Sequence, residues 1–319
     1  MPGPAGKGRG RSVVSAPKPL ISVIVPHLNQ HEALEACLAS LSAQSFARTR
    51  YEVIVVDNGS TRVPEDLIAA VDGVRLERES EPGPGPARNR GAAAARGEIL
   101  AFIDADCRAG TDWLALIART LSAVDRAVVL GGDVRIDFKD PDRPTMLEGY
   151  EAVFAYRQQE YIERHGFSGT GNLAVRRDDF FRVGPFRGIN VAEDKEWGRR
   201  ARGRGYQFVY VPDMIVFHPA RCGLDDLFAK WRRHVWHEFE ALRTEHRSRA
   251  AWCLRALAVA LSPLVHAWCI LVSRRVSGAR ARALAVVALA RVRLFRSALM
   301  LRLVLDPDAA VRPPSWNRP

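Results

Sequence analysis

Short apolar runs rich in β-branched residues recur through the first third of the chain, and most are followed by segments with helical spacing. The runs 20–26, 51–57 and 98–103 are almost entirely apolar, which predicts strands buried on both faces. A further strand is expected over 74–77, and helices over 31–44, 64–71, 87–96 and 112–122. Strands and helices that alternate through short connections predict an α/β fold, with a doubly wound, mostly parallel sheet and helices on both faces.

The middle of the chain continues this alternation. Strands are expected over 127–137, 173–175, 206–211 and 214–217, and helices over 145–164, 193–202 and 227–245. Between the third strand and the following helix, the segment 81–86 contains three prolines and two glycines, so we expect neither helix nor central strand there.

Positive charge is concentrated towards the C-terminal end. The chain has a formal net charge of +11, and from residue 251 onward eleven arginines are opposed only by Asp306 and Asp308. Two apolar stretches, 256–272 and 283–305, lie in this region and predict helices. The second contains arginines, which favours an amphipathic helix at a membrane interface over a span of about 20 apolar residues. The first fits either arrangement, and packing in a soluble core or dimer interface is the alternative for both.

These patterns predict three parts. Residues 1–19 are rich in Gly, Pro and basic residues and are expected to form a disordered basic tail. Residues 20–225 form the α/β unit, and 226–319 a helical, basic, membrane-associated region. The five cysteines are far apart without a CxxC pair, which fits a reducing, cytoplasmic setting. Arginines clustered among apolar residues favour an anionic membrane surface as a partner, and nucleic acid is not expected.

Carboxylates follow two of the predicted strands at the edge where such sheets bind ligands. Asp104 and Asp106 come directly after the strand 98–103, and together they can hold a hard divalent cation that neutralises a diphosphate. Asp57 ends another strand and can accept a proton from a base N–H or a ribose hydroxyl; a simple turn is the alternative. Arg88 follows the Gly-Pro segment, where it either faces the same ligand or is a solvated helix cation.

Taken in order, these segments resemble the family 2 glycosyltransferases, which have the GT-A fold. The motifs that carry the resemblance are Ser22–Asn29, Val55–Thr61, Ala87–Gly91, Phe102–Asp106, Gly169–Arg177, Gly184–Phe186 and Ala192–Arg200. They cover roughly residues 20–219, and several ordered motifs are far more specific than any one of them.

The resemblance implies an inverting, single-displacement transfer of a sugar from a nucleotide-diphosphate sugar to an acceptor hydroxyl. It implies donor binding by Pro26, Asn29, Asp57, Arg88 and Asp104. It implies a Mn²⁺ or Mg²⁺ ion at Asp106 and His218, Asp194 as general base, and acceptor-side roles for Gly171, Asn172 and Glu193. For His218, a core or turn histidine is the alternative. Because acidic residues also favour helix N-termini, a purely structural role for the Glu193–Asp194 pair is the alternative.

The chain departs from the family pattern at a few positions. Asn58 replaces a second aspartate, and His27-Leu28 replaces the usual Thr-Tyr, so the base and the sugar are not identified. The Gln-x-x-Arg-Trp signature of processive synthases is missing at Lys230–Arg233, which favours transfer of a single sugar.

The basic, apolar C-terminal region suits a lipid-linked or polysaccharide acceptor at the cytoplasmic face of the cell membrane. Two other functions are alternatives to this one. A catalytically inactive, membrane-associated scaffold of the same fold is disfavoured by the intact carboxylates. A nucleotidyltransferase is disfavoured because residues 26–30 contain neither glycine nor a cation.

Overall fold

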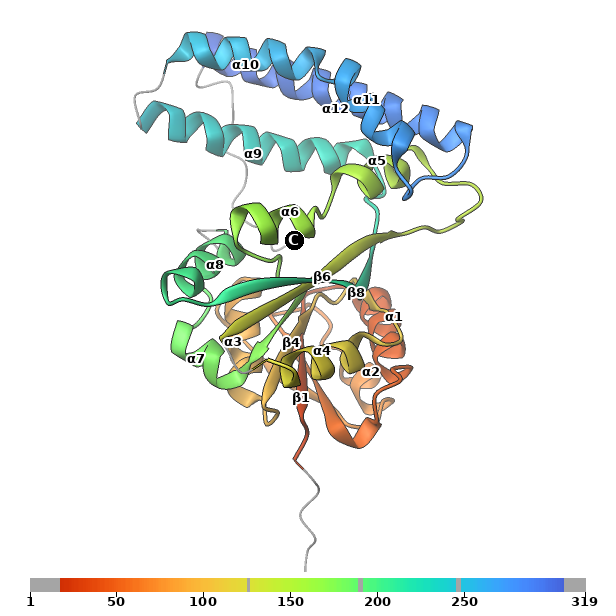
Figure 1. Ribbon diagram of the computed structural model, residues 1–319, viewed down its shortest axis with the longest axis vertical. Helices are drawn as coiled ribbons and strands as arrows, with labels where there is room; N and C mark the ends of the chain where they lie inside the picture. Colours follow the sequence, from red (N-terminus) through yellow and green to blue (C-terminus); the bar gives the residue numbers. More distant parts are fainter. Residues whose placement is uncertain (1–17, 125–126, 189–191, 245–247, 307–319) are drawn as a thin grey trace, which may run out of the picture.

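The computed structural model describes residues 18–124, 127–188, 192–244 and 248–306. Nearly all of the predicted N-terminal tail lies outside these ranges, as does Glu245 at the predicted end of a helix. Figure 1 shows the sheet and its helices at one end of the molecule and a layer of long helices at the other.

The first half of the sheet follows the predicted alternation. Its strands are β1 (Ile21–His27), β2 (Tyr51–Asp57), β3 (Val74–Arg78) and β4 (Ile99–Ile103). The connecting segments contain α1 (His31–Ser42), the 3-10 turn η1 (Arg48–Arg50), α2 (Glu65–Ala69) and α3 (Pro84–Ala94). These strands pair in parallel in the order β3-β2-β1-β4. Their carboxyl ends therefore meet at one edge of the sheet.

The second half makes the sheet mixed rather than mostly parallel. It contains β5 (Arg108–Ala109), β6 (Val128–Asp137), β7 (Asn172–Arg176) and β8 (Gln207–Pro219), and the full order is β3-β2-β1-β4-β7-β6-β8-β5. Strand β7 is antiparallel to both neighbours, β4 and β6, and β5 is antiparallel to β8. The chain stays at the carboxyl edge after β6, so β7 must run back from that edge.

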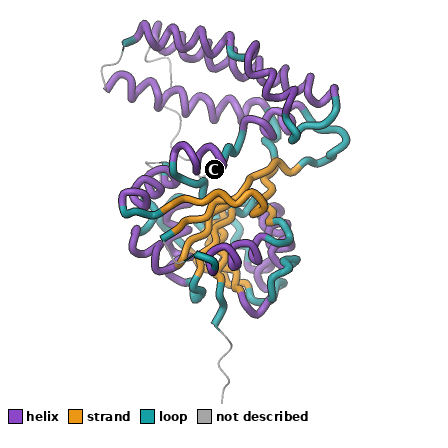
Figure 2. Tube along the Cα trace, viewed as in Figure 1, coloured by secondary structure: helices purple, strands orange, loops and turns teal. Residues whose placement is uncertain are grey.

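Helices cover both faces of the sheet, as predicted (Figure 2). On one face, α1 and α4 (Trp113–Ser122) bury Leu34, Leu38 and Trp113 against alternate residues of β1, β2 and β4. On the other, α3, α7 (Arg177–Val183) and α8 (Glu193–Gly203) enclose Phe102 among aromatic side chains. Burial on both faces explains why these strands are almost wholly apolar.

Two predicted helices differ from the structure. Helix α3 begins at Pro84, inside the Gly-Pro segment expected to be irregular, because proline needs no N–H partner in a first helical turn. The helix expected over 145–164 is divided into α5 (Met146–Phe154), α6 (Gln158–Glu160) and the π-helical turn η2 (Tyr161–His165). Tyr156, with φ at 48°, interrupts it.

Strand β8 is continuous, although two strands were expected. A bulge separates the pair Gly132–Val211 from the pair Asp133–Ile215, and it accommodates Pro212, which cannot donate to the ladder. Helix α7 was not predicted, because seven residues give little periodic signal.

Asn172 is a buried structural link at the start of β7. Its Oδ1 accepts a hydrogen bond from the Trp113 indole N–H at 2.9 Å, and its Nδ2 donates to the carbonyl oxygens of Asp133 and Met214, both at 2.8 Å. The side chain is fully buried. It thus joins α4, β6 and β8, and it does not line the cavity described below.

The C-terminal helices form a separate layer, set apart from the sheet (Figure 1). They are α9 (Leu224–Thr244), α10 (Arg249–Leu261), α11 (Pro263–Val272) and α12 (Ala279–Leu305). Helix α5 packs against them through Leu147 and Tyr150. Within the described ranges, no single helix has the length and apolar character needed to cross a membrane; α10 and α11 meet that requirement only together, and they are bent by 43° where they meet.

Candidate active site

A cavity of about 670 Å³ opens at the carboxyl edge of the sheet, beneath α9. Four predicted site residues from the first half of the chain line it, namely Pro26, Arg88, Asp104 and Asp106. Four from the second half line it as well, namely Gly171, Glu193, Asp194 and His218. The structure thus brings together residues that are far apart in the sequence.

Arg88 is buried at the centre of this site. Its Nη2 lies 2.5 Å from Asp104 Oδ1, and its Nη1 lies 3.1 Å from Glu193 Oε1. Burial opposes the charge on the guanidinium, but the two carboxylates more than offset it and keep the pKa of Arg88 above its ordinary value. The interpretation as a solvated helix cation was therefore wrong, because only 3% of Arg88 is exposed.

The loop before β7 packs directly on this ion pair. A Cβ atom at Gly171 would lie 2.7 Å from Asp104 Oδ2. Any larger residue would displace the carboxylate, so glycine is needed here to let the loop approach. Gly171 and Asp104 consequently form one wall of the cavity.

Asp106 and His218 lie together at another part of the cavity. Asp106 Oδ2 is 3.5 Å from His218 Nε2, and among the described residues these two and Cys107 form a group that could hold a metal ion. His218 Nδ1 is 2.6 Å from the carbonyl oxygen of Pro219, an arrangement in which Nδ1 carries the proton. Nε2 then presents its lone pair, with the Tyr156 hydroxyl 2.8 Å away.

The donor set fits a hard divalent cation. Carboxylate oxygen and imidazole nitrogen are suitable ligands for Mn²⁺. Burial raises the pKa of the Cys107 thiol well above its usual range, and Asp104 and Asp106 raise it further. Hard divalent cations also prefer oxygen ligands to thiolate, so we expect Cys107 to remain outside the ligand set. Burial also raises the pKa of Asp106, and His218 partly opposes this. A cation would favour the ionised carboxylate.

Asp194 stands at the start of α8, next to the partner of Arg88. Burial raises the pKa of its carboxyl, while the hydrogen bond from the Lys195 N–H, 2.7 Å from Oδ1, acts in the opposite direction. A carboxylate with a raised pKa that faces a cavity is suited to accept a proton. Asp194 also lies at a helix N-terminus, where acidic residues are favoured, so the alternative of a purely structural role agrees with the structure as well.

Two predicted donor residues lie outside the lining. Asn29 is exposed, and its Oδ1 accepts hydrogen bonds from the N–H and hydroxyl of Thr61 at 2.9 and 3.1 Å. Asp57 Oδ2 accepts hydrogen bonds from the N–H groups of Gly59 and Ser60. This is the geometry of a simple turn, the alternative interpretation of Asp57. Its Oδ1 is buried without a hydrogen-bond partner among the described residues, so it can still accept from a ligand.

The cavity also contains residues that the sequence did not single out. Lys230 and His234 of α9 line it. Burial lowers the pKa of Lys230 to about 8, and burial together with Lys230 lowers the pKa of His234 to about 4. No sequence pattern marks these two, because their position depends on how the helical layer packs. The sequence gives no signal for Tyr156 either, because its role in the cavity is evident only from the structure, where it has a left-handed backbone conformation and contacts His218.

Comparisons with known proteins agree on one family. Residues 22–196 match the model described as Glycosyl transferase family 2. The glycosyltransferase AglE of Haloferax volcanii is 35% identical over 209 residues, which are 64% of this chain and 68% of AglE. Validoxylamine A glucosyltransferase of Streptomyces hygroscopicus subsp. limoneus is 32% identical over 154 residues, 46% of this chain and 33% of that protein. The chain thus spans about a third of this second relative.

A solved structure resembles most of the chain. It is the mannosyltransferase PcManGT from Pyrobaculum calidifontis in complex with GDP-Man and Mn²⁺, with a TM-score of 0.56 and 20% identity. The match covers 90% of this chain and 86% of that one. At this identity the likeness concerns the fold.

Replacing Arg88 tests the buried ion pair. Arg88→Met leaves Asp104 and Glu193 without their cation, and we expect the free energy of unfolding to fall by about 3–5 kcal/mol. Urea unfolding at neutral pH measures the change. Arg90→Met is the matched control, since Arg90 pairs with Glu77 at the surface and should cost about 0–1 kcal/mol. Equal losses in the two variants would contradict the central role of Arg88.

Proposed function

The chain belongs to glycosyl transferase family 2, and on that premise we propose that this glycosyltransferase moves a single sugar, with inversion, from a nucleotide-diphosphate sugar to a hydroxyl of a lipid-linked or polysaccharide acceptor. The observation that carries the proposal is the arrangement of carboxylates in one cavity. Asp104 and Asp106 lie at the end of β4, and Asp194 lies at the start of α8. Donor and acceptor groups can therefore meet between them.

The donor would bind on the side formed by the first half of the chain. Pro26 lines this side, Asp104 would contact the ribose, and the unpartnered Oδ1 of Asp57 would accept a hydrogen bond from the base or ribose. Asp106 and His218 would hold Mn²⁺ or Mg²⁺, which would neutralise the diphosphate as it leaves. PcManGT was solved with GDP-Man and Mn²⁺, which supports this kind of donor site.

Asp194 would be the general base. As the acceptor oxygen bonds to the anomeric carbon, its proton moves to the Asp194 carboxylate. The bond from that carbon to the diphosphate oxygen breaks, and its electron pair stays on the diphosphate. A single displacement of this kind inverts the anomeric centre. Arg88 keeps Asp194 in place by holding its neighbour, Glu193.

We also propose that the helical layer associates with an anionic membrane at its cytoplasmic face. Helices α10 and α11 expose large apolar side chains, among which Leu264 is 82%, Val265 72% and Trp268 67% exposed. Large exposed apolar side chains gathered on two consecutive helices support an interaction site there. The exposed Arg274 and Arg280 follow it in the chain and suit anionic headgroups.

Removing the proposed base should abolish transfer and leave donor binding intact. Asp194→Asn is expected to reduce the transfer rate by roughly 10²–10⁴-fold, with little change in binding of the nucleoside diphosphate. Because burial raises the pKa of Asp194, the wild-type kcat/KM should fall with decreasing pH from a point above 3.8, the ordinary value for an aspartate. Asp178→Asn, at an exposed position on α7, is the control. Unchanged transfer by Asp194→Asn would remove Asp194 from the mechanism.

The metal site can be tested without turnover. Asp106→Asn and His218→Ala should each weaken Mn²⁺ binding by roughly tenfold or more, because each removes a ligand. Cys107→Ser should bind Mn²⁺ as wild type does, since we expect the thiol to remain outside the ligand set. Electron paramagnetic resonance of free Mn²⁺ measures all three. If the cysteine variant alone lost the metal, the ligand set would be wrong.

Membrane association is tested with vesicles of phosphatidylcholine and phosphatidylglycerol. Replacing both Leu264 and Trp268 by Glu should reduce co-sedimentation with these vesicles by roughly tenfold or more, because two apolar side chains leave the bilayer interface. Phe181→Glu, on α7 of the sheet unit, is the control, as Phe181 is also exposed. Binding that survives the double substitution would exclude this surface as the membrane contact.

A further inference from the structure

A second cavity, of about 700 Å³, lies beside the active site. Its lining is formed by Tyr161, His165, Phe167, Lys195, Arg199, Arg202 and Gly203, and we call it the α8 groove. Tyr161, Phe167 and Lys195 line the active-site cavity too. The groove is therefore adjacent to the position of Asp194, and neither Asp106 nor His218 lines it.

Two glycines allow the walls of the α8 groove to come together. Gly166 ends the turn η2 with φ at 65°, a left-handed conformation, and a Cβ atom there would lie 2.3 Å from Arg202 Cδ. A Cβ atom at Gly198 would lie 2.5 Å from Phe167 Cβ. With glycine at both positions, α8 packs closely against η2, and the Arg202 side chain lies over the turn.

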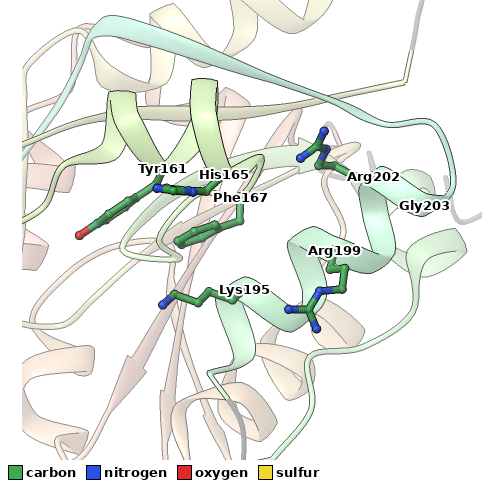
Figure 3. Close-up of a pocket in the computed structure, with 7 residues that line it drawn as sticks. All are labelled: Tyr161, His165, Phe167, Lys195, Arg199, Arg202 and Gly203. Atoms are coloured by element: carbon green, nitrogen blue, oxygen red, sulfur yellow. The ribbon is translucent and has the colours of Figure 1, made fainter. Parts of the chain in front are cut away.

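The walls differ in chemistry. Figure 3 shows aromatic rings from η2 and the residues after it on one side, and basic side chains from α8 on the other. The rings of Tyr161 and Phe167 are stacked at 5.2 Å, and Lys195 Nζ lies 5.7 Å from the Phe167 ring centre. An apolar surface next to cations is suited to a sugar ring that carries a negative charge.

The three cations of the α8 groove have no ion-pair partner among the described residues. Lys195 and Arg199 are four residues apart on one helix face, a like-charge spacing that is mildly unfavourable. Arg200, on the same helix, is different, because it binds Glu196 at 2.8 Å and the carbonyl oxygens of Val183 and Pro185. Fold stability therefore accounts for Arg200, whereas ion pairing accounts for none of Lys195, Arg199 and Arg202 among the described residues.

We propose that the α8 groove is an acceptor subsite for an anionic group, a phosphate or a carboxylate, carried next to the hydroxyl that receives the sugar. This inference rests on the proposed function, since it takes Asp194 as the base that faces that hydroxyl. Lys195 directly follows Asp194 in the chain, so an anion held by the groove would lie close to the base. Arg199 and Arg202 would bind it through charge-assisted hydrogen bonds.

The test uses small sugars as probes while the donor site is filled. The protein is first saturated with Mn²⁺ and UDP, and in a parallel series with Mn²⁺ and GDP. Glucose 1-phosphate, glucuronic acid and methyl glucoside are then titrated by calorimetry. We expect an anionic sugar to bind at least roughly tenfold more tightly than methyl glucoside. If glucose 1-phosphate binds more tightly, the group is a phosphate; if glucuronic acid binds more tightly, it is a carboxylate.

Variants locate the binding. The double variant Arg199→Gln/Arg202→Gln should lose roughly tenfold or more in affinity for that anionic sugar, and its affinity for UDP or GDP should be unchanged. Arg204→Gln removes an exposed arginine just beyond α8, outside the groove, and should have no effect. Both arginines of the double variant are exposed, so the fold should persist.

The outcomes separate the two proposals. Equal binding of charged and neutral sugars, or full affinity in the double variant, would overturn the anionic subsite. If neither UDP nor GDP binds with Mn²⁺, the donor-site proposal fails instead. The same sugar titrations on nucleotide-free protein then still decide the groove, because only binding that depends on Arg199 and Arg202 counts for it.

Discussion

The ion pair of Arg88 with Asp104 and Glu193 is the interaction on which the site depends. A buried guanidinium is tolerated only when its charge is balanced, and here the balance comes from two elements, β4 and α8. The same contact therefore fixes α8 against the sheet. Since Asp194 follows Glu193 directly, the guanidinium side chain, together with the buried Trp197 of α8, helps to set the distance between the proposed donor and acceptor groups.

The direction of β7 determines what else reaches the cavity. Because the chain remains at the carboxyl edge after β6, the segments between β6 and β7 lie over that edge and contribute Tyr156, Gln158 and Gly171. Strand β8 then brings His218 to Asp106. A sheet with only parallel strands would have carried the chain away from the site between strands. The mixed topology is thus the reason that the proposed metal ligands and the proposed acceptor side share one cavity.

The sequence predicted the local features of this arrangement better than the long-range ones. The strands of the first half and the position of Asp104 and Asp106 follow from apolar runs and their ends, which are local signals. Asn172 looked like a ligand-binding residue, yet it is buried among α4, β6 and β8. Lys230 and His234 line the cavity only because the C-terminal layer packs over it. Contacts of this kind have no signature in residue spacing.

The difference between local and long-range contacts also affects which part of the site selects the substrate. The proposed donor side lies at the ends of adjacent parallel strands, whose geometry is fixed by a buried core and leaves little freedom. The proposed acceptor side consists of η2, α8 and α9, which join the sheet mainly through side chains. On α8, Arg200 is used by the fold, whereas Arg199 and Arg202 face the groove without partners among the described residues. Residues that stability does not require are free to be selected for binding, so under the proposed function this face of α8 would match the charge of the acceptor.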